Sequence, residues 1–356
     1  MTVAEDSIIV RNIYYMMAYA FKALDIESFA RLKTENFDNI ADLMAAILSI
    51  GISLQLKRGI EKEYMETDDH LHGIKGRVDM RGTARLAIQQ RAEVSCQFDE
   101  FGPNTYKNRI LKTSAMILLR HPDVNHLRRR DLKRCLILMH DVSELNPHRI
   151  EWSRLSYHRN NSSYQILMNV CYMVINSLIL STDQGSAKLA SFSDSQQLHA
   201  LYEKFVLEYF KREHHELKAS AKEIDRGVSN DAPSFLPQLC TDVTLEMPGR
   251  TLIIDTKCYG RILGLHFNHE IMNRDNLNQI QSYVMHEAFS NQDIEVSGML
   301  LYALTEHDIA HRDSWDELGH RFHLWTLNLG QPFPGIAHDL DEIARLVSKP
   351  RSINNV

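Results

Sequence analysis

The sequence predicts a mixed α+β protein, with an N-terminal helical region that carries a small β element and a C-terminal α/β domain. Two observations predict this fold class. Apolar residues recur at helical spacing over much of residues 1–180. Beyond a polar stretch, residues 181–197, helical patterns alternate with short apolar runs typical of strands. We therefore expect an N-terminal region of residues 1–180, a linker of residues 181–197 and a C-terminal domain of residues 198–356.

The composition is that of an ordinary globular protein, since 44% of the 356 residues are hydrophobic and 24% are charged. Five scattered cysteines without Cys-x-x-Cys spacing argue against a disulfide framework or a zinc ribbon and favour a reducing cytoplasm. The N-terminus lacks a secretory pattern. The formal net charge of -6 does not fit a protein that holds nucleic acid by charge alone. Phosphate chemistry therefore requires a local site, a metal ion or a partner.

The N-terminal region is predicted to be mostly helical, over residues 10–56 and again over residues 108–180. Its most membrane-like stretch, residues 164–180, is interrupted by three amide side chains and is shorter than a full span, so we expect a buried helix and no membrane contact. The basic run at residues 127–135 is interpreted as a solvated helix face, with phosphate contact or a protein interface as alternatives.

Between these helices, HLHGIKGRVDMRGTARL, which begins at His70, predicts small strands and a hairpin. Gly73 and Gly76 flank Lys75 and indicate a tight turn.

The C-terminal domain is predicted to begin with an amphipathic helix, because its large apolar residues share one stripe: Leu198, Leu201, Tyr202, Phe205 and Tyr209. A hairpin, a helix at DNLNQIQSYVMHEAF, strands at VSGMLLYAL and FHLWTLNL, and a closing helix at GIAHDLDEIARLV follow in order.

The hairpin is TDVTLEMPGRTLIIDTKCYG, which begins at Thr241. Pro248 and Gly249 suit the central positions of a type II turn, which would pair Met247 with Arg250. Type II turns suit hairpins less well than the primed types, so a slip of one residue stays open.

In this register two acids and a lysine gather in the strands. Asp242 lies opposite Asp255, and Lys257 projects from the same face as Asp255, whereas Thr256 points the other way. Like charges opposite each other destabilise a sheet, so the pattern favours a neutralising cation. Carboxylate oxygens suit Mg²⁺, and the lysine could act on the attacking water or on the phosphate. The alternative is a turn cap at Asp242 and a surface ion pair between Asp255 and Lys257.

The order of these residues resembles the PD-(D/E)xK nuclease superfamily. The resemblance implies that Asp242 and Asp255 are the two acids and that Lys257 is the lysine, with the Thr256 carbonyl as a further metal ligand. A glutamate of the preceding helix often assists in that superfamily, and Glu203 matches its place better than Glu208. One departure is that no proline precedes Asp242.

The following helix carries Gln279 and Tyr283, four residues apart and therefore on one face. A Gln-x-x-x-Tyr pair in this helix resembles an accessory motif of one branch of the superfamily, which implies support of the site and of the DNA backbone. Simple helix packing is the alternative.

Six blocks in sequence, from about residue 10 to residue 335, resemble the McrC family, the nuclease subunit of the modified-cytosine-dependent McrBC restriction system: VRNIYYMMAYAFKAL, GIKGRVDM, NRILKTSAMILL, LYEKFVLEYFKRE, IIDTKCY and NLNQIQSYV. The resemblance implies an N-terminal region that docks on a McrB-like AAA+ hexamer and stimulates its GTP hydrolysis. It also implies a Mg²⁺-dependent C-terminal region that cleaves double-stranded DNA. Lys75 and Arg77 are candidate partner contacts, and a simple tight turn is the alternative.

The partner, and not this chain, would bind GTP and recognise methylated cytosine. The absence of any Gly-Lys dipeptide, and hence of a phosphate-binding loop, fits this division. Double-strand cleavage would require two sites, so we expect dimerisation through the nuclease domain or pairing of whole complexes. Two alternatives stay open: a non-catalytic regulator of an AAA+ GTPase, and a defence nuclease with a different motor or with unmodified DNA as substrate.

Overall fold

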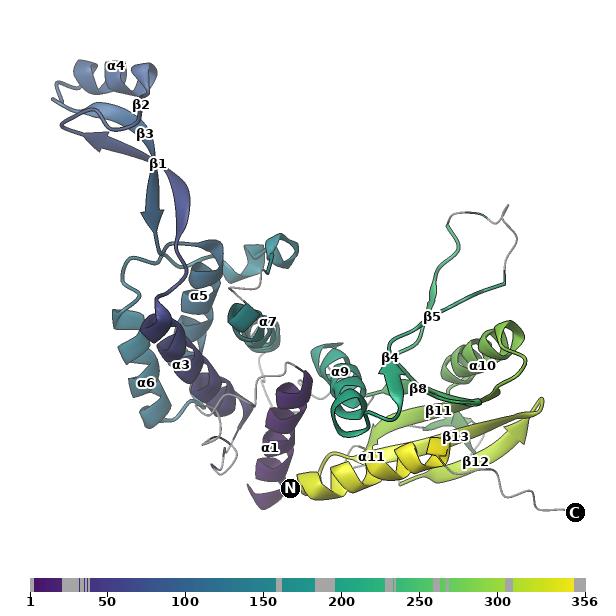
Figure 1. Ribbon diagram of the computed structural model, residues 1–356. Coiled ribbons are helices and arrows are strands. Elements are labelled where there is room, and N and C mark those ends of the chain that lie inside the picture. Colours follow the sequence, from purple (N-terminus) through teal and green to yellow (C-terminus); the bar gives the residue numbers. More distant parts are fainter. Residues whose placement is uncertain are drawn as a thin grey trace, which may run out of the picture. The chain divides into compact units, whose positions relative to one another are not determined.

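The chain forms two compact units in a computed structural model (Figure 1). The structure describes residues 3–20, 32, 35, 37, 39–157, 162–182, 196–227, 233, 235–258, 263–266, 269–304 and 310–348. Unit 1 comprises Met1–Ile40 together with Leu180–Val356, and unit 2 comprises Ala41–Ile179. The mixed α+β class is confirmed. Of the predicted linker, residues 183–195 lie outside the described residues.

The first forty residues group with the C-terminal domain, which differs from the predicted N-terminal region of residues 1–180. The reason is aromatic packing along helix α1 (Val3–Ala20). The ring of Tyr15 stacks on Phe333 with centroids 4.3 Å apart, and Tyr19 contacts Phe205 edge to face at 5.8 Å. These contacts join helices far apart in the sequence, which local periodicity cannot reveal.

Unit 2 combines helices with a small three-stranded sheet of order β1-β3-β2. Its elements are α3 (Ile40–Arg58), β1 (Glu63–Leu71), β2 (Arg77–Val78), α4 (Met80–Ile88), β3 (Val94–Gly102), α5 (Tyr106–Arg120), α6 (His126–Ile137), the 3-10 turns η2 (Pro147–Arg149) and η3 (Trp152–Arg154), and α7 (Ser162–Thr182). Strands β1 and β3 pair antiparallel over their full length and form a narrow arm, capped by β2 and α4, that extends from the helices of this unit (Figure 1).

Helix α4 replaces part of the hairpin that the sequence predicted. The Asp79 side chain caps it, because its carboxylate accepts hydrogen bonds from the backbone N–H groups of Arg81 and Gly82 at 3.0 Å each. At Gly76 the chain bends just before β2, and no hydrogen-bonded tight turn is formed by the described residues there. The φ of Gly76 is +67°, and an added Cβ would lie 2.5 Å from the Gln97 carbonyl oxygen, so only glycine fits.

The two most apolar helices of unit 2 belong to its core. Residues 164–175 of α7 are mostly buried, as predicted. Helix α3 is long and apolar enough to cross a membrane by length and composition, yet 67% of its apolar window is buried inside the protein.

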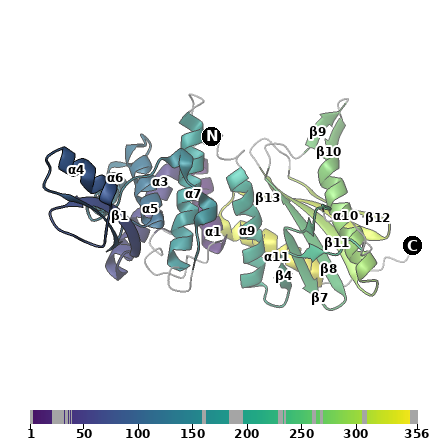
Figure 2. The ribbon, with the colours of Figure 1, turned by 90° about the horizontal axis from the view of Figure 1, so that it is seen from above.

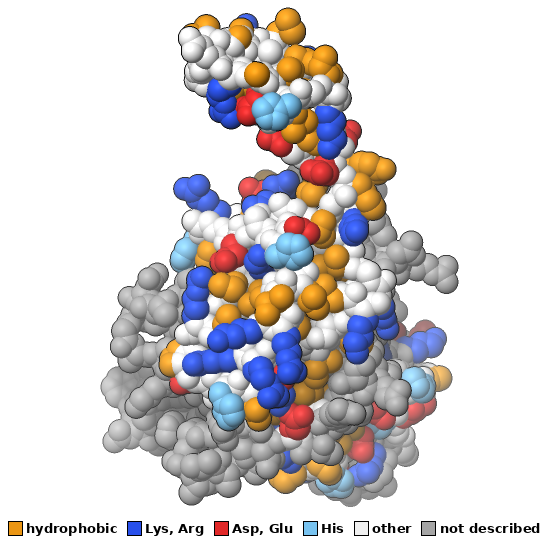
Figure 3. All heavy atoms as spheres, turned by 90° about the vertical axis from the view of Figure 1, so that its left-hand side faces the viewer, with side chains coloured by type: hydrophobic (Ala, Val, Ile, Leu, Met, Phe, Trp, Pro, Cys, Tyr) orange, Lys and Arg blue, Asp and Glu red, His pale blue; other side chains and the backbone are white. Residues whose placement is uncertain are grey.

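The basic run at residues 127–135 forms α6, whose Arg130 and Arg134 side chains are 59% and 70% exposed. Basic side chains gather on this face of unit 2 (Figure 3), which agrees with the predicted solvated face.

Unit 1 contains a mixed six-stranded sheet of order β12-β13-β11-β8-β7-β4. Its elements after α1 are α9 (Gln196–Glu213), β4 (Lys218–Ser220), β5 (Glu223–Ile224), β6 (Leu239–Cys240), β7 (Val243–Met247), β8 (Arg250–Lys257), β9 (Leu263–His266), β10 (His269–Met272), α10 (Arg274–Ser290), β11 (Glu295–Leu304), β12 (Arg312–Glu317), β13 (His320–Asn328) and α11 (Phe333–Ser348). Strand β11 runs parallel to β8 and β13, whereas the pairs β7–β8, β4–β7 and β12–β13 are antiparallel.

The sheet of unit 1 lies between two helical layers (Figure 2). Helices α9 and α11 pack on one face and α10 packs on the other. The predicted stripe of α9 is fully buried. Under α10, Ile253 of β8 joins a core cluster with Ile280 and Val284 of the helix. Because side chains alternate along a strand, Asp255 and Lys257 project toward the α10 side of the sheet.

Candidate functional site

The predicted hairpin register is confirmed. Strand β7 pairs with β8 so that Val243 opposes Ile254 and Met247 opposes Arg250. The turn residue Gly249 has a φ of +79°, as a type II turn requires at its second central position. The register places the end of β8, with Asp255 and Lys257, at the start of β7 and the adjoining Asp242.

Asp255 is the most deeply buried acid of the site. It lies in β8, between β7 and β11, and its exposed fraction is 0%. Burial raises the pKa of Asp255 to about 6, although Lys257 opposes this rise and the negative charge of Asp242 adds to it. Among the described residues, no hydrogen-bond donor reaches Asp255 Oδ1. The carboxylate therefore has bonding capacity that the described protein groups leave unused.

Lys257 lies beside this carboxylate, with its Nζ 2.7 Å from Asp255 Oδ2 and an exposed fraction of 6%. The interpretation of Asp255 and Lys257 as a surface ion pair is wrong, because both residues are buried. A buried lysine requires compensation, which the carboxylate supplies.

Asp242 directly precedes β7, so no ladder pair fixes it opposite Asp255. Its Oδ2 accepts hydrogen bonds from the backbone N–H of Thr256 at 2.7 Å and from Thr256 Oγ1 at 2.9 Å. Thr256 therefore anchors the Asp242 carboxylate through its backbone N–H and its hydroxyl. The sequence analysis had expected only the Thr256 carbonyl to take part in the site, as a metal ligand. The two acids still interact, since the charge of Asp242 raises the pKa of Asp255.

Glu203 of α9 faces the same group. Its pKa is raised to about 7, chiefly by burial and in part by the charges of Asp242 and Asp255, while Lys257 opposes the rise. Three carboxylates and one lysine therefore influence one another, and Glu203 is the glutamate that the superfamily resemblance expected near this group.

Sequence reasoning missed His199, which precedes Glu203 by one helical turn. Burial lowers the pKa of His199, while the charge of Asp242 and a hydrogen bond to the Thr256 backbone raise it. The signal that could have revealed this residue is its spacing of four from Glu203, which places both on one face of α9.

Gln279 and Tyr283 of α10 extend the site. Lys257 Nζ donates a hydrogen bond to Gln279 Oε1 at 3.1 Å, and Gln279 Nε2 donates to the Tyr283 hydroxyl at 2.9 Å. The alternative of simple helix packing does not account for this chain of polar contacts, which runs from Asp255 through Lys257 and Gln279 to Tyr283.

The donor chemistry of this group fits a hard divalent cation. Mg²⁺ takes one or two protein carboxylates and completes its shell with water, and Asp255 Oδ1 has no protein donor in the described ranges. Zinc sites need three or four protein ligands. Within the part of the chain that the structure describes, no three or more His, Cys, Asp or Glu side chains are grouped so that they could hold a metal ion, which argues against zinc. A Mg²⁺ ion here would have one or two protein carboxylates as ligands and water in its remaining positions.

Known proteins with similar sequences point to one system. A family model described as McrBC 5-methylcytosine restriction system component matches residues 3–303. The Type IV methyl-directed restriction enzyme EcoKMcrBC of Escherichia coli (strain K12) is 28% identical over 338 residues, which cover 94% of this chain and 96% of that protein.

Two solved structures show weaker similarity. A half-complex from a tetradecameric assembly of Thermococcus gammatolerans McrB AAA+ hexamers with bound McrC matches at TM-score 0.49 and 14% identity, over 94% of this chain and 76% of that chain. The cryo-EM structure of the Thermococcus gammatolerans McrBC complex matches at TM-score 0.39 and 16% identity, over 57% of this chain and 58% of that chain. The family assignment therefore rests on the sequence matches.

We predict that the metal-free wild-type protein loses stability relative to Asp255→Asn as pH rises. The pKa of Asp255 is raised from 3.8 to about 6 in the folded state, so its ionisation costs stability as pH rises through this window. In EDTA the melting temperature of wild type should fall relative to that of the variant by roughly 2–6 °C between pH 4 and pH 7.5. The substitution also leaves the buried Lys257 ammonium without its carboxylate, a cost that is the same at both pH values. A difference in melting temperature that does not change with pH would show that ionisation of Asp255 costs no stability.

Proposed function

The chain belongs to the family of McrBC 5-methylcytosine restriction system components, and from this premise we propose that it is the nuclease subunit of such a system. It would hydrolyse phosphodiester bonds of double-stranded DNA with Mg²⁺ as cofactor. A GTP-hydrolysing AAA+ partner would recognise the modified cytosine, and the complex would act in the cytoplasm. The C-terminal domain would be of the PD-(D/E)xK type.

The observation that carries this proposal is the buried Asp255 carboxylate, with one oxygen that no described donor reaches and a lysine 2.7 Å from the other. A sheet selected for stability alone would place an apolar residue in this central position. An acid that costs stability in a cluster of titratable groups is typical of a catalytic site.

Asp242, Asp255 and the Thr256 carbonyl would hold Mg²⁺, with Glu203 binding through water. When bound, the cation would neutralise the carboxylates and activate a water molecule. Asp255 and Gln279 hold the Lys257 ammonium in place. From there Lys257 would orient the attacking water or stabilise negative charge on the phosphate oxygens.

Gln279 and Tyr283 would keep Lys257 oriented. The Gln279 amide accepts from the ammonium through its oxygen and donates to Tyr283 through its nitrogen, so rotation of the amide would break both contacts. The Tyr283 hydroxyl can still donate one hydrogen bond, which we assign to the DNA backbone.

The arm of unit 2 would be the part that docks on the AAA+ partner. McrC of Thermococcus gammatolerans is bound to McrB AAA+ hexamers. In this chain large apolar side chains are exposed on the arm, and these have exposed fractions of 56–83%: Tyr64, Ile74, Met80, Ile88 and Phe101. Exposed apolar residues concentrated on a narrow projection support a protein-binding role. Lys75 is held over the Phe98 ring at 3.7 Å, so we assign it to the same surface together with Arg77.

Cleavage of both strands would require two nuclease sites, supplied by dimerisation of the nuclease domain or by pairing of complexes. The regulator alternative predicts loss of a catalytic residue, and each residue expected from the superfamily pattern is present in the sequence.

The direct test of the proposed function is cleavage of methylated plasmid by the purified chain with its AAA+ partner, GTP and Mg²⁺. Asp255→Ala and Lys257→Ala should each lower the cleavage rate by roughly 10²–10³-fold or more, because the first removes a proposed metal ligand and the second removes the ammonium that would act on the attacking water or the phosphate. Both variants should still stimulate GTP hydrolysis. Cleavage by the variants at the wild-type rate would exclude this group as the active site.

Docking through the arm is tested by Ile74→Asp. If the side chain is buried against the partner, the charge should weaken the apparent affinity in a GTPase-stimulation titration by roughly 10–100-fold, which corresponds to burial of one large apolar side chain. The matched control is Ile137→Asp, at an isoleucine of α6 with nearly the same exposed fraction, 70% against 75%. Equal effects of the two substitutions would argue against the arm as the docking element.

A further inference from the structure

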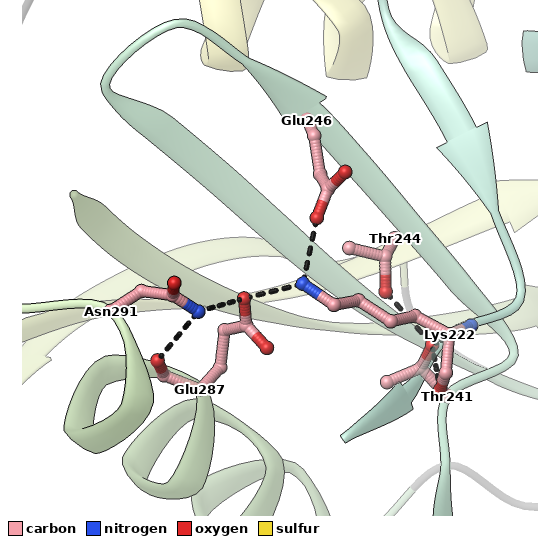
Figure 4. Close-up of polar contacts among 6 residues, drawn as sticks. All are labelled: Lys222, Thr241, Thr244, Glu246, Glu287 and Asn291. Carbon is pink, nitrogen blue, oxygen red and sulfur yellow. Dashed lines mark hydrogen bonds and ion pairs between the residues drawn. The ribbon is translucent and has the colours of Figure 1, made fainter. Parts of the chain in front are cut away.

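A lysine outside the proposed catalytic group joins three segments of unit 1. Lys222 lies between β4 and β5, and its Nζ donates to Glu246 Oε1 of β7 at 2.8 Å and to Glu287 Oε1 of α10 at 2.7 Å (Figure 4). Asn291 Nδ2 donates to the same Glu287 oxygen at 3.0 Å. The lysine thus ties the sheet to the helix above it.

The ion pair is not an ordinary surface contact. The exposed fraction of the Glu287 side chain is 3%, whereas that of Lys222 is 31%. A carboxylate this deeply buried costs free energy unless it is paired, and an apolar residue at this position of α10 would pack without that cost. Stability alone therefore gives no reason for the charge.

The backbone of Lys222 holds the segment that carries Asp242. Thr241 N donates to the Lys222 carbonyl at 2.9 Å, and Lys222 N donates to Thr241 Oγ1 at 3.0 Å. Thr241 Oγ1 also lies 2.8 Å from Thr244 Oγ1 (Figure 4). Because Asp242 follows Thr241 directly and lies outside β7, these bonds fix the backbone from which its carboxylate projects.

The other end of the ion pair lies on the helix face that carries the accessory residues. Glu287 follows Tyr283 by four residues and Gln279 by eight, so all three share one face of α10. A displacement of α10 at Glu287 would move the Gln279 amide that contacts Lys257.

We infer that Lys222 is a positioning residue of the nuclease site, which through Glu287 fixes α10 relative to the segment that bears Asp242. It touches no reacting atom in this account. This role rests on the proposed nuclease function. It adds to that function an ion pair that sets the distance between Asp242, a proposed metal ligand, and the α10 residues that orient Lys257.

The test uses the full chain with its AAA+ partner, GTP and methylated plasmid, and measures cleavage rate against Mg²⁺ concentration. Lys222→Met and the isosteric Glu287→Gln should each lower the rate or raise the half-saturating Mg²⁺ concentration by roughly 10–100-fold, as is typical of groups that support metal ligands. Lys222→Arg should restore most of the activity, because it keeps the charge.

The double variant Lys222→Met/Glu287→Gln separates positioning from stability. It leaves no buried charge unpaired, so its melting temperature should recover toward wild type while its cleavage rate stays low. The matched control is Arg250→Met, which removes an ion pair with Glu295 (Nε to Oε2, 3.4 Å) at the opposite end of β8 from Asp255. This control should cut at the wild-type rate.

Two outcomes would overturn the inference: cleavage by the double variant at the wild-type rate and Mg²⁺ requirement, or an equal loss in Arg250→Met. Failure of the nuclease function has a different signature. In that case wild type would not cut, or Asp255→Ala would cut as well as wild type, and the positioning role would fall with the function.

Discussion

The structure of unit 1 depends on one costly feature, an acidic side chain at the centre of a sheet. Asp255 is fully buried in β8 with Lys257 beside it. Burial of a carboxylate is unfavourable unless a cation and hydrogen bonds compensate it, and one oxygen of Asp255 has no donor among the described residues. The fold accepts this cost in an interior strand, where Asp255 pairs with Leu300 of β11 and the preceding Ile254 pairs with Val243 of β7.

The surrounding elements hold the other groups around that carboxylate. The hairpin brings Asp242 to the end of β8, α9 supplies Glu203, and α10 supplies Gln279 to the lysine. Each comes from a different layer of the three-layer unit, so the group depends on correct packing of all layers. The Lys222–Glu287 ion pair joins the sheet to α10. A change in the distance between these two layers would move Gln279 relative to Asp242.

Local sequence signals predicted much of this arrangement. A turn formed by Pro248 and Gly249, together with alternation along the strands, was sufficient for the hairpin register. Periodicity located α9 and α10 because each buries one continuous stripe. The sequence did not predict β12, whose exposed edge position allows a polar sequence, or α4, which depends on the Asp79 cap. The Lys222–Glu287 contact joins residues that are 65 positions apart in the sequence. Periodicity describes only local structure, so it could not predict this pair.

The most direct test of the central claim is calorimetric titration of the metal-free protein with Mg²⁺ or Mn²⁺, comparing wild type with Asp255→Asn. The account predicts a saturable site in wild type that the substitution abolishes, because the buried carboxylate supplies the principal charged ligand. It also predicts that the wild-type protein gains thermal stability on binding, since the cation neutralises the clustered acids. Equal binding by both proteins would contradict the account, because the buried charge of Asp255 would then have no metal to hold.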